Sequence, residues 1–158
     1  MAHFCIDNGA NAVVGHGPHL LRPIEIYKNR PIFYSLGDFI LQLYSVNIAP
    51  EDFFRTENLT SDSTVHELLK KRSNNFTKGL MEDIRMNETV IPYWETDDNG
   101  DLTHLELLPL SLSMHGKKSD EGLPFISKDT GFIEKLAKIS EAYGTKIEMQ
   151  GEVAVCKW

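Results

Sequence analysis

The chain has 158 residues, 41% of them hydrophobic and 25% charged, which is the composition of a globular domain large enough to bury its own core. Its 23 acidic residues outnumber its 16 lysines and arginines, and the resulting net charge of −7 disfavours nucleic acid as a partner. Two cysteines cannot form a disulfide framework, and the apolar runs fall short of the ~20 residues that a membrane-spanning helix needs.

The N-terminal residues predict a layered α/β arrangement. Residues Ala2 to Asn8 are expected to form a helix that ends at Gly9, and Ala10 to Gly15 to form a short buried strand. The chain opens inside this helix without a capping residue or a signal peptide. We therefore expect upstream structure to belong to the same fold.

A hairpin and an irregular insertion follow. Strands are predicted for Ile24 to Tyr27 and Pro31 to Leu36, joined by a polar turn at Lys28-Asn29-Arg30. Residues 43–87 lack a sustained strand pattern. One helix is predicted there, from about Ser63 to Ser73, with Ser61-Asp62-Ser63 able to cap it.

The C-terminal part predicts a second sheet. Thr89 to Glu95 and Leu102 to Leu112 flank a turn that contains Asn99-Gly100, the strongest hairpin signal in the sequence. A polar loop with Gly116, Gly122 and Pro124 comes next. A helix with an apolar face is then expected, ending at Gly144, and its apolar residues are Phe132, Ile133, Leu136, Ile139 and Tyr143.

Two short strands, Lys146 to Met149 and Val153 to Cys156, close the predicted fold. The whole chain is expected to be one domain in three parts. Residues 1–42 form the core that carries the motifs, residues 43–88 the insertion, and residues 89–158 the hairpin, helix and closing strands.

Two histidines lie close together directly after the first predicted strand. His16 and His19 flank Gly17-Pro18, and imidazoles on a tight loop at a strand end can converge on a metal ion. A turn whose histidines hydrogen-bond only to the backbone fits the same spacing. Zinc needs about four ligands and manganese or iron about six, so further donors would have to come from elsewhere.

Three sequence segments around these histidines match one known pattern. They read I-D-N-G-A-N-A-V-V-G-H-G-P-H from Ile6, I-E-I-Y from Ile24 and P-I-F-Y-S-L-G-D-F from Pro31. This stretch resembles the late part of CapA-type poly-γ-glutamate capsule synthesis proteins, which usually carry G-H-H-P-H and S-L-G-N-F. Residues Leu107 to Leu112, Gly122 to Pro124 and Ile139 to Ile147 resemble the tail of that family more loosely.

The resemblance implies an α/β (α+β) fold, part of a calcineurin-like metallophosphoesterase sandwich of two sheets flanked by helices, with its N-terminal half missing. It assigns His16 and His19 to a metal site and Glu25 and Asp38 to its surroundings as candidate catalytic residues. The family's segments upstream of the histidine loop, a strand that ends in G-D, a G-N-N-H segment and an H-W-G segment, are not found ahead of that loop in this chain. A divalent cation (Mn, Fe or Zn) is expected in a full-length parent, and no tightly bound metal in this chain alone.

Two departures from the family pattern leave alternatives open. Gly17 replaces the middle histidine, so either His16 and His19 are both ligands or His19 alone is. Asp38 replaces an asparagine and is either a ligand or a turn-forming residue. Glu25 is expected to position His19 or Arg22, or else to be an exposed strand residue.

A basic segment, residues 70–75 with Lys78, either lines a cleft for an anionic substrate or forms a solvated helix face.

Two alternative functions follow from the resemblance. The parent is a metal-dependent hydrolase of capsule or cell-envelope biology, or this region is a scaffold or acidic-polymer-binding module without chemistry. The expected partners are an acidic polymer or a phosphate-containing substrate, no nucleic acid, and a second copy or the missing N-terminal half. The location that the resemblance implies is the extracellular face of the bacterial cell envelope.

Overall fold

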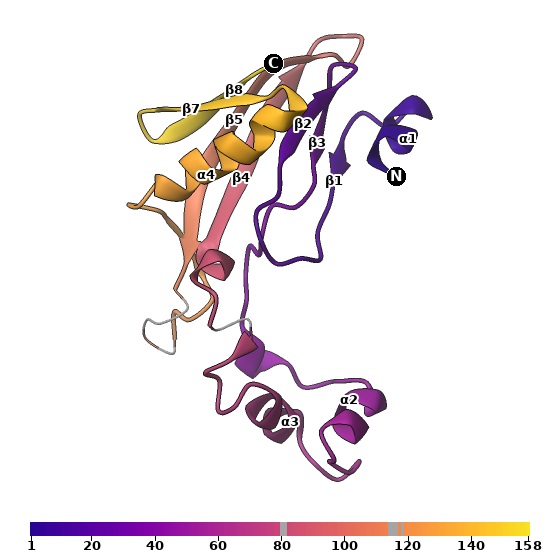
Figure 1. Cartoon of the computed structure of the whole chain (residues 1–158), viewed down its shortest axis with the longest axis vertical. Helices are drawn as coiled ribbons and strands as arrows, with labels where there is room; N and C mark the ends of the chain where they lie inside the picture. Colours follow the sequence, from indigo (N-terminus) through magenta and orange to yellow (C-terminus); the bar gives the residue numbers. More distant parts are fainter. Residues whose placement is uncertain (80–81, 114–116, 118) are drawn as a thin grey trace.

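The protein, seen here in a computed structural model that describes residues 1–79, 82–113, 117 and 119–158, contains two β-sheets with helices beside them (Figure 1). The smaller sheet has the strand order β1-β3-β2. Strand β1 runs parallel to β3, and β2 runs antiparallel to it. The strands are β1 (Val13–Val14), β2 (Ile24–Tyr27) and β3 (Arg30–Phe33).

The β2–β3 hairpin forms where the sequence predicts it. Lys28 and Asn29 in its turn have positive φ values of 51° and 57°, the pattern of a two-residue turn whose twist matches that of the strands. Strand β1 is shorter than the predicted Ala10 to Gly15, because Gly9, at a φ of 99°, and a bend at Asn11 delay entry into extended structure. The predicted strands that begin at Ala10 and at Pro31 lie next to each other in this sheet as β1 and β3, and β3 ends at Phe33, before the predicted Leu36.

The larger sheet has the order β4-β5-β8-β7, and β6 also pairs with β5. The predicted Asn-Gly hairpin is confirmed, with a slight shift in register near Thr96. Residues Pro124–Ile126 form β6 where the sequence predicted a polar loop, because they pair with the end of β5; Gly116 lies outside the described residues. The strands are β4 (Glu88–Thr96), β5 (Leu102–Leu112), β6 (Pro124–Ile126), β7 (Lys146–Gln150) and β8 (Val153–Lys157).

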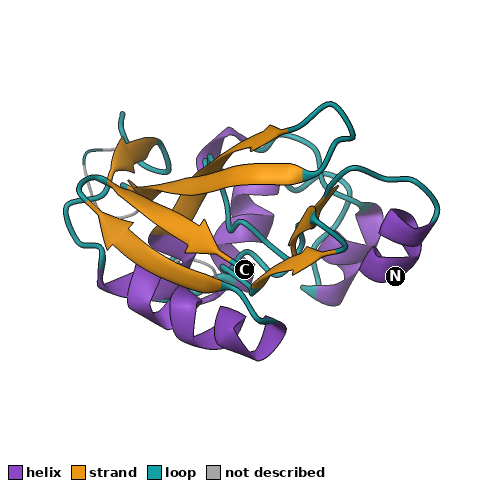
Figure 2. Ribbon diagram, turned by 90° about the horizontal axis from the view of Figure 1, so that it is seen from above, coloured by secondary structure: helices purple, strands orange, loops and turns teal. Residues whose placement is uncertain are grey.

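Two helices lie close to the sheets. The N-terminal helix α1 (Ala2–Asp7) forms as predicted and lies at one side of the molecule, seen from above in Figure 2. The predicted C-terminal helix is also confirmed, as α4 (Gly131–Ser140) followed by the 3₁₀ turn η4 (Glu141–Tyr143). It ends at Gly144 in a left-handed conformation, which glycine adopts without a steric penalty. No described helix is long and apolar enough to span a membrane.

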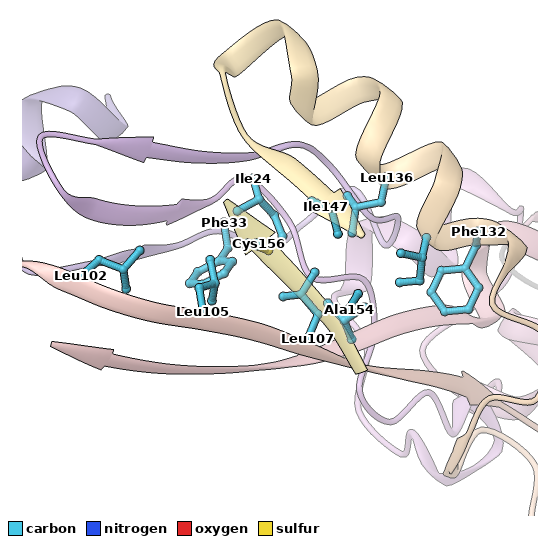
Figure 3. Packing of buried hydrophobic residues seen from close by; sticks show 12 residues of the cluster. Ile24, Phe33, Leu102, Leu105, Leu107, Phe132, Leu136, Ile147, Ala154 and Cys156 are labelled. Carbon is cyan, nitrogen blue, oxygen red and sulfur yellow. The ribbon is translucent and has the colours of Figure 1, made fainter. Parts of the chain in front are cut away.

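The hydrophobic core lies between the two sheets and α4 (Figure 3). Ile24 and Phe33 project from the small sheet, and both are almost completely buried. They meet Leu105 and Leu107 of β5 and Leu136 of α4 in one cluster. Burying each of these large side chains contributes about 1.5–3 kcal/mol, so this cluster holds the two sheets together.

The insertion extends away from the sheets (Figure 1). Helix α3 (Val65–Arg72) matches the predicted helix, but Thr64 caps it in place of Ser61 to Ser63, through a reciprocal bond with Glu67. A second helix, α2 (Glu51–Thr56), was not predicted, because six residues carry too little apolar periodicity. Two 3₁₀ turns, η1 (Leu43–Ser45) and η3 (Ile84–Asn87), lie near the two ends of the insertion.

The insertion leaves and rejoins the core at neighbouring points. The Thr89 hydroxyl donates a 2.7 Å hydrogen bond to the Leu36 carbonyl, and a Cβ on Gly37 would lie 2.7 Å from the Glu88 carbonyl oxygen. Farther out, the Leu41 amide donates to the Gly122 carbonyl. Gly37 is therefore required both by its φ of 76° and by the close approach of the β4 backbone.

Gly37→Ala should destabilise the protein by about 2–4 kcal/mol, because the strain of a positive φ adds to an overlap with backbone that cannot move aside. Gly151→Ala is the matched control, since Gly151 has a similar φ of 68° and open space around it. It should cost only about 1 kcal/mol. Urea denaturation of both variants measures the difference, and equal losses would contradict the steric argument.

Candidate functional site

The loop that carries the two histidines begins under a tight backbone constraint. The Gly15 amide donates a 2.7 Å hydrogen bond to the Phe33 carbonyl, which continues the β1–β3 pairing by one residue. A Cβ on Gly15 would lie 2.6 Å from the Tyr34 carbonyl oxygen. Only glycine fits at this close approach, so the start of the loop is fixed against β3.

His19 and Asp38 are brought together from two segments. The His19 Nδ1 lies 2.9 and 3.0 Å from the two carboxylate oxygens of Asp38. The Asp38 side chain is 18% exposed and that of His19 41%, so the pair lies partly shielded at the surface. His19 has a φ of 59°, a left-handed conformation that is uncommon for a residue with a side chain.

The contact with Asp38 determines which ring nitrogen of His19 is available. An ionised carboxylate only accepts hydrogen bonds, so Nδ1 carries the proton that is shared with Asp38. In the neutral imidazole the other nitrogen, Nε2, then has a free lone pair. His19 can therefore act as a metal ligand or as a proton acceptor through Nε2.

His16 does not join this pair. It is exposed, and within residues 1–79 and the other described ranges no hydrogen bond, ion pair or ring contact involves it. The structure thus brings together His19 and Asp38 of the four residues singled out from the sequence. His16 and Glu25 lie outside that contact.

Glu25 lies in a different cluster. Its Oε1 accepts a 2.9 Å hydrogen bond from His3 Nε2, and its Oε2 accepts one of 2.7 Å from the Tyr34 hydroxyl. No described hydrogen bond joins Glu25 to His19 or Arg22, the two residues that it was expected to position. Both carboxylate oxygens of this buried side chain are thus used to connect α1, β2 and the end of β3.

Burial raises the pKa of the Tyr34 hydroxyl, and the neighbouring Glu25 carboxylate raises it further. The hydroxyl therefore remains protonated and a hydrogen-bond donor at neutral pH. The His3 ring also stacks on Tyr27, with centroids 4.0 Å apart and planes 12° apart. This cluster holds α1 on the small sheet.

His3 and Tyr34 were missed as partners of Glu25. One signal was present for the helix: His3 and Asp7 are four residues apart and so share a helix face. Asp7 completes that face by accepting from Lys28 Nζ at 2.6 Å. For Tyr34 the signal was the strand alternation. Glu25 lies opposite Ile32 in the hairpin, and Tyr34, two residues after Ile32, lies on the same face as both.

The metal-ligand set is incomplete within the described residues. Among them, no group of three or more His, Cys, Asp and Glu side chains is placed to hold a metal ion. His19 and Asp38 are one candidate ligand and its carboxylate partner.

The family model of the bacterial capsule synthesis protein PGA_cap matches residues 1–43 of the chain. This range contains the histidine loop and both candidate carboxylates. The N-terminal segment is of the CapA type.

The relatives extend this assignment in two ways. The PGA biosynthesis protein CapA of Bacillus subtilis is 52% identical over 40 residues, or 25% of the chain and 10% of that protein. The capsule biosynthesis protein CapA of Bacillus anthracis is 48% identical over 40 residues. The proteins y4sH and y4uA of Sinorhizobium fredii are 30% identical over 167 residues, which cover 99% of the chain and 36% of each relative.

The chain thus spans about a third of the length of the Sinorhizobium relatives. Its similarity to the CapA proteins concerns the core that carries the histidine loop, whereas the similarity to y4sH continues through the insertion and the larger sheet. The chain is related to a family of capsule biosynthesis proteins through the CapA-type segment.

Tyr34→Phe should destabilise the chain by about 1–3 kcal/mol, because it leaves one oxygen of the buried Glu25 carboxylate without a donor. Tyr93→Phe is the matched control, since the Tyr93 hydroxyl donates to Glu95 at 2.8 Å on the exposed surface. That loss should stay within about 0.5 kcal/mol. Thermal unfolding of the two variants compares them, and a larger loss for Tyr93→Phe would refute the assigned role of the buried bond.

Proposed function

We propose that this chain is part of a metal-dependent protein of capsule-polymer biosynthesis, in which His19 binds a divalent cation (Mn, Fe or Zn) through Nε2. Asp38 is the residue that positions the His19 ring. The observation that carries the proposal is the contact of His19 Nδ1 with both oxygens of Asp38. Metal-binding histidines almost always donate their other ring N–H to a carboxylate or carbonyl, which fixes the ring and strengthens the donor.

The backbone conformation of His19 supports the same role. A left-handed φ on a non-glycine residue costs of order 1–3 kcal/mol and is concentrated at functional sites. Two constraints flank this segment, the close approach of Gly15 to β3 and that of Gly37 to β4. They tie the His19 loop and the segment of Asp38 to neighbouring strands.

The remaining ligands would come from other parts of a longer protein, since the chain spans 36% of the length of its Sinorhizobium relatives. A bound cation would polarise the bond to be cleaved and supply hydroxide at neutral pH, so the proposed reaction is hydrolysis in an acidic polymer or a phosphate-containing substrate. His16, exposed on the same loop, is a second candidate ligand. Glu25 holds α1 in place, because both of its oxygens are already used.

With one or two imidazoles, this chain alone should bind Mn²⁺ only weakly. We expect paramagnetic Mn²⁺ at millimolar concentration to broaden the NMR signals of the His16–His19 loop. His19→Ala should abolish this broadening, and Asp38→Ala should reduce the apparent affinity about 10-fold or more. Glu25→Gln is the control and should leave the affinity unchanged.

Loop broadening that persists in His19→Ala but disappears in His16→Ala would contradict the assignment of His19. A longer parent protein that binds an acidic polymer without any metal would favour the alternative, a scaffold or polymer-binding module. Stoichiometric metal and turnover in that parent protein would favour the enzyme.

We also propose that the outer edge of β1, which pairs with no other strand that the structure describes, pairs with a strand either from a second copy or from the rest of a longer chain. The opposite edge of the small sheet is covered, since the Ile24 amide donates to the buried Ser140 hydroxyl. On β1 the Val14 side chain is 48% exposed, and an edge strand without a partner strand is a template for pairing.

The chain alone should therefore self-associate at high concentration, and Val14→Lys should shift it to monomer, since a charge on an edge strand opposes pairing. Val46→Lys is the control, because Val46 is similarly exposed, at 42%, but lies in the insertion. Sedimentation velocity measures both variants. A clean monomer for the unchanged chain would count against pairing between two copies.

A further inference from the structure

A groove of about 990 Å³ connects the insertion with the histidine loop. His19 lines one part of it, and the end of α3 and the segment around η3 line the rest. Its volume is in the range of pockets that hold ligands the size of a cofactor or drug, and is much larger than one amino-acid side chain needs. Its lining is mainly apolar, through Leu43, Leu69, Phe76, Ile84 and Met86.

Two cationic side chains, Arg72 and Lys78, also line the groove. Arg72 lies over the Phe53 ring at 4.6 Å, which holds its guanidinium in place. Lys78 has no ion-pair partner among the residues that the structure describes. Its charge is therefore available to a ligand.

The acidic residues of the lining oppose these cations only in part. The Asp83 carboxylate is paired with Arg85, whose Nε lies 2.9 and 3.0 Å from its two oxygens. That contact lowers the pKa of Asp83 and neutralises its charge locally. Glu82 is the remaining acid, so once Asp83 is paired with Arg85 the two cations of the lining, Arg72 and Lys78, face one carboxylate that is unpaired within the part of the chain that the structure describes.

We propose that this groove binds an amphipathic anion, a small molecule with an apolar ring or chain that carries an acidic group. The apolar part lies on the Leu69, Ile84 and Met86 surface, and the acidic group is held by Arg72 and Lys78. Burial of apolar surface supplies affinity, and the two cations select for the anion. His19 also lines the groove, so the bound anion is the substrate of that site or the portion of the substrate that is not cleaved. This identification of the ligand rests on the function proposed for His19.

The basic segment, residues 70–75 with Lys78, contributes side chains to two different hollows. Arg72 and Lys78 line the groove, whereas Lys70 and Lys71 line a separate, smaller hollow with Glu67. The chain thus contains its own control. Two pairs of cations from the same segment differ in whether they line the groove.

Two fluorescent probes that differ in an acidic group test the proposal without any metal. They are 1-anilinonaphthalene-8-sulfonate, which is anionic, and N-phenyl-1-naphthylamine, which has the same rings and no charge. In the double variant Arg72→Gln, Lys78→Gln, the affinity for the anionic probe should fall about 10-fold, and that for the neutral probe should change less than about twofold. Lys70→Gln with Lys71→Gln should leave both affinities unchanged.

Ile84→Ser should weaken both probes, since Ile84 offers apolar surface and is 63% exposed, so the variant is expected to fold. The proposal would be overturned if the anionic probe did not bind. It would also be overturned if the double variant at Arg72 and Lys78 and the double variant at Lys70 and Lys71 lost the same affinity for that probe. His19→Ala separates the two inferences. If it abolishes the Mn²⁺ effect and leaves the anionic probe bound, both stand; if the Mn²⁺ effect persists, the metal site alone fails.

Discussion

The packing of Ile24 and Phe33 against β5 and α4 is the interaction on which the rest of the structure depends. The small sheet consists of strands of two to four residues, too short to be stable by themselves. Its register, and with it the position of the histidine loop, is therefore maintained by side chains that lie on the larger sheet. A residue such as Leu105, far from any polar group of the site, contributes to the geometry of His19 through this contact.

Contacts outside the candidate site stabilise its conformation. His19 keeps an unfavourable backbone conformation and Asp38 a partly shielded carboxylate, and both are tolerated because Gly15 and Gly37 tie their segments to neighbouring strands. The polar cluster of His3, Glu25 and Tyr34 has a structural role that differs from that of the His19–Asp38 pair. It attaches a short helix that could not form alone, since a helix of six residues is far below the length at which isolated helices are stable.

Most strands could be predicted, because alternating apolar residues and turn residues act locally. Asn99-Gly100 and Lys28-Asn29 determined their hairpins, and Gly144 determined the end of α4. Strand β6 could not be predicted, since its pairing with β5 depends on a contact between distant segments. The site was predicted in the same uneven way. The sequence pattern singled out His19 and Asp38, but their mutual contact, and the partners of Glu25, depend on how β2, β3 and α1 are placed in space.

The chain segments that lead into and out of the insertion meet at Gly37 and Glu88, and this has an evolutionary consequence. A segment whose ends are already adjacent can change in length at little cost to the core, because a fivefold change in loop length alters the closure entropy by only ~1.4 kcal/mol. Variation in this segment would remodel the walls beside His19 while Asp38 stays in place. Related chains can thus vary this peripheral segment while the contact between His19 and Asp38 is inherited intact.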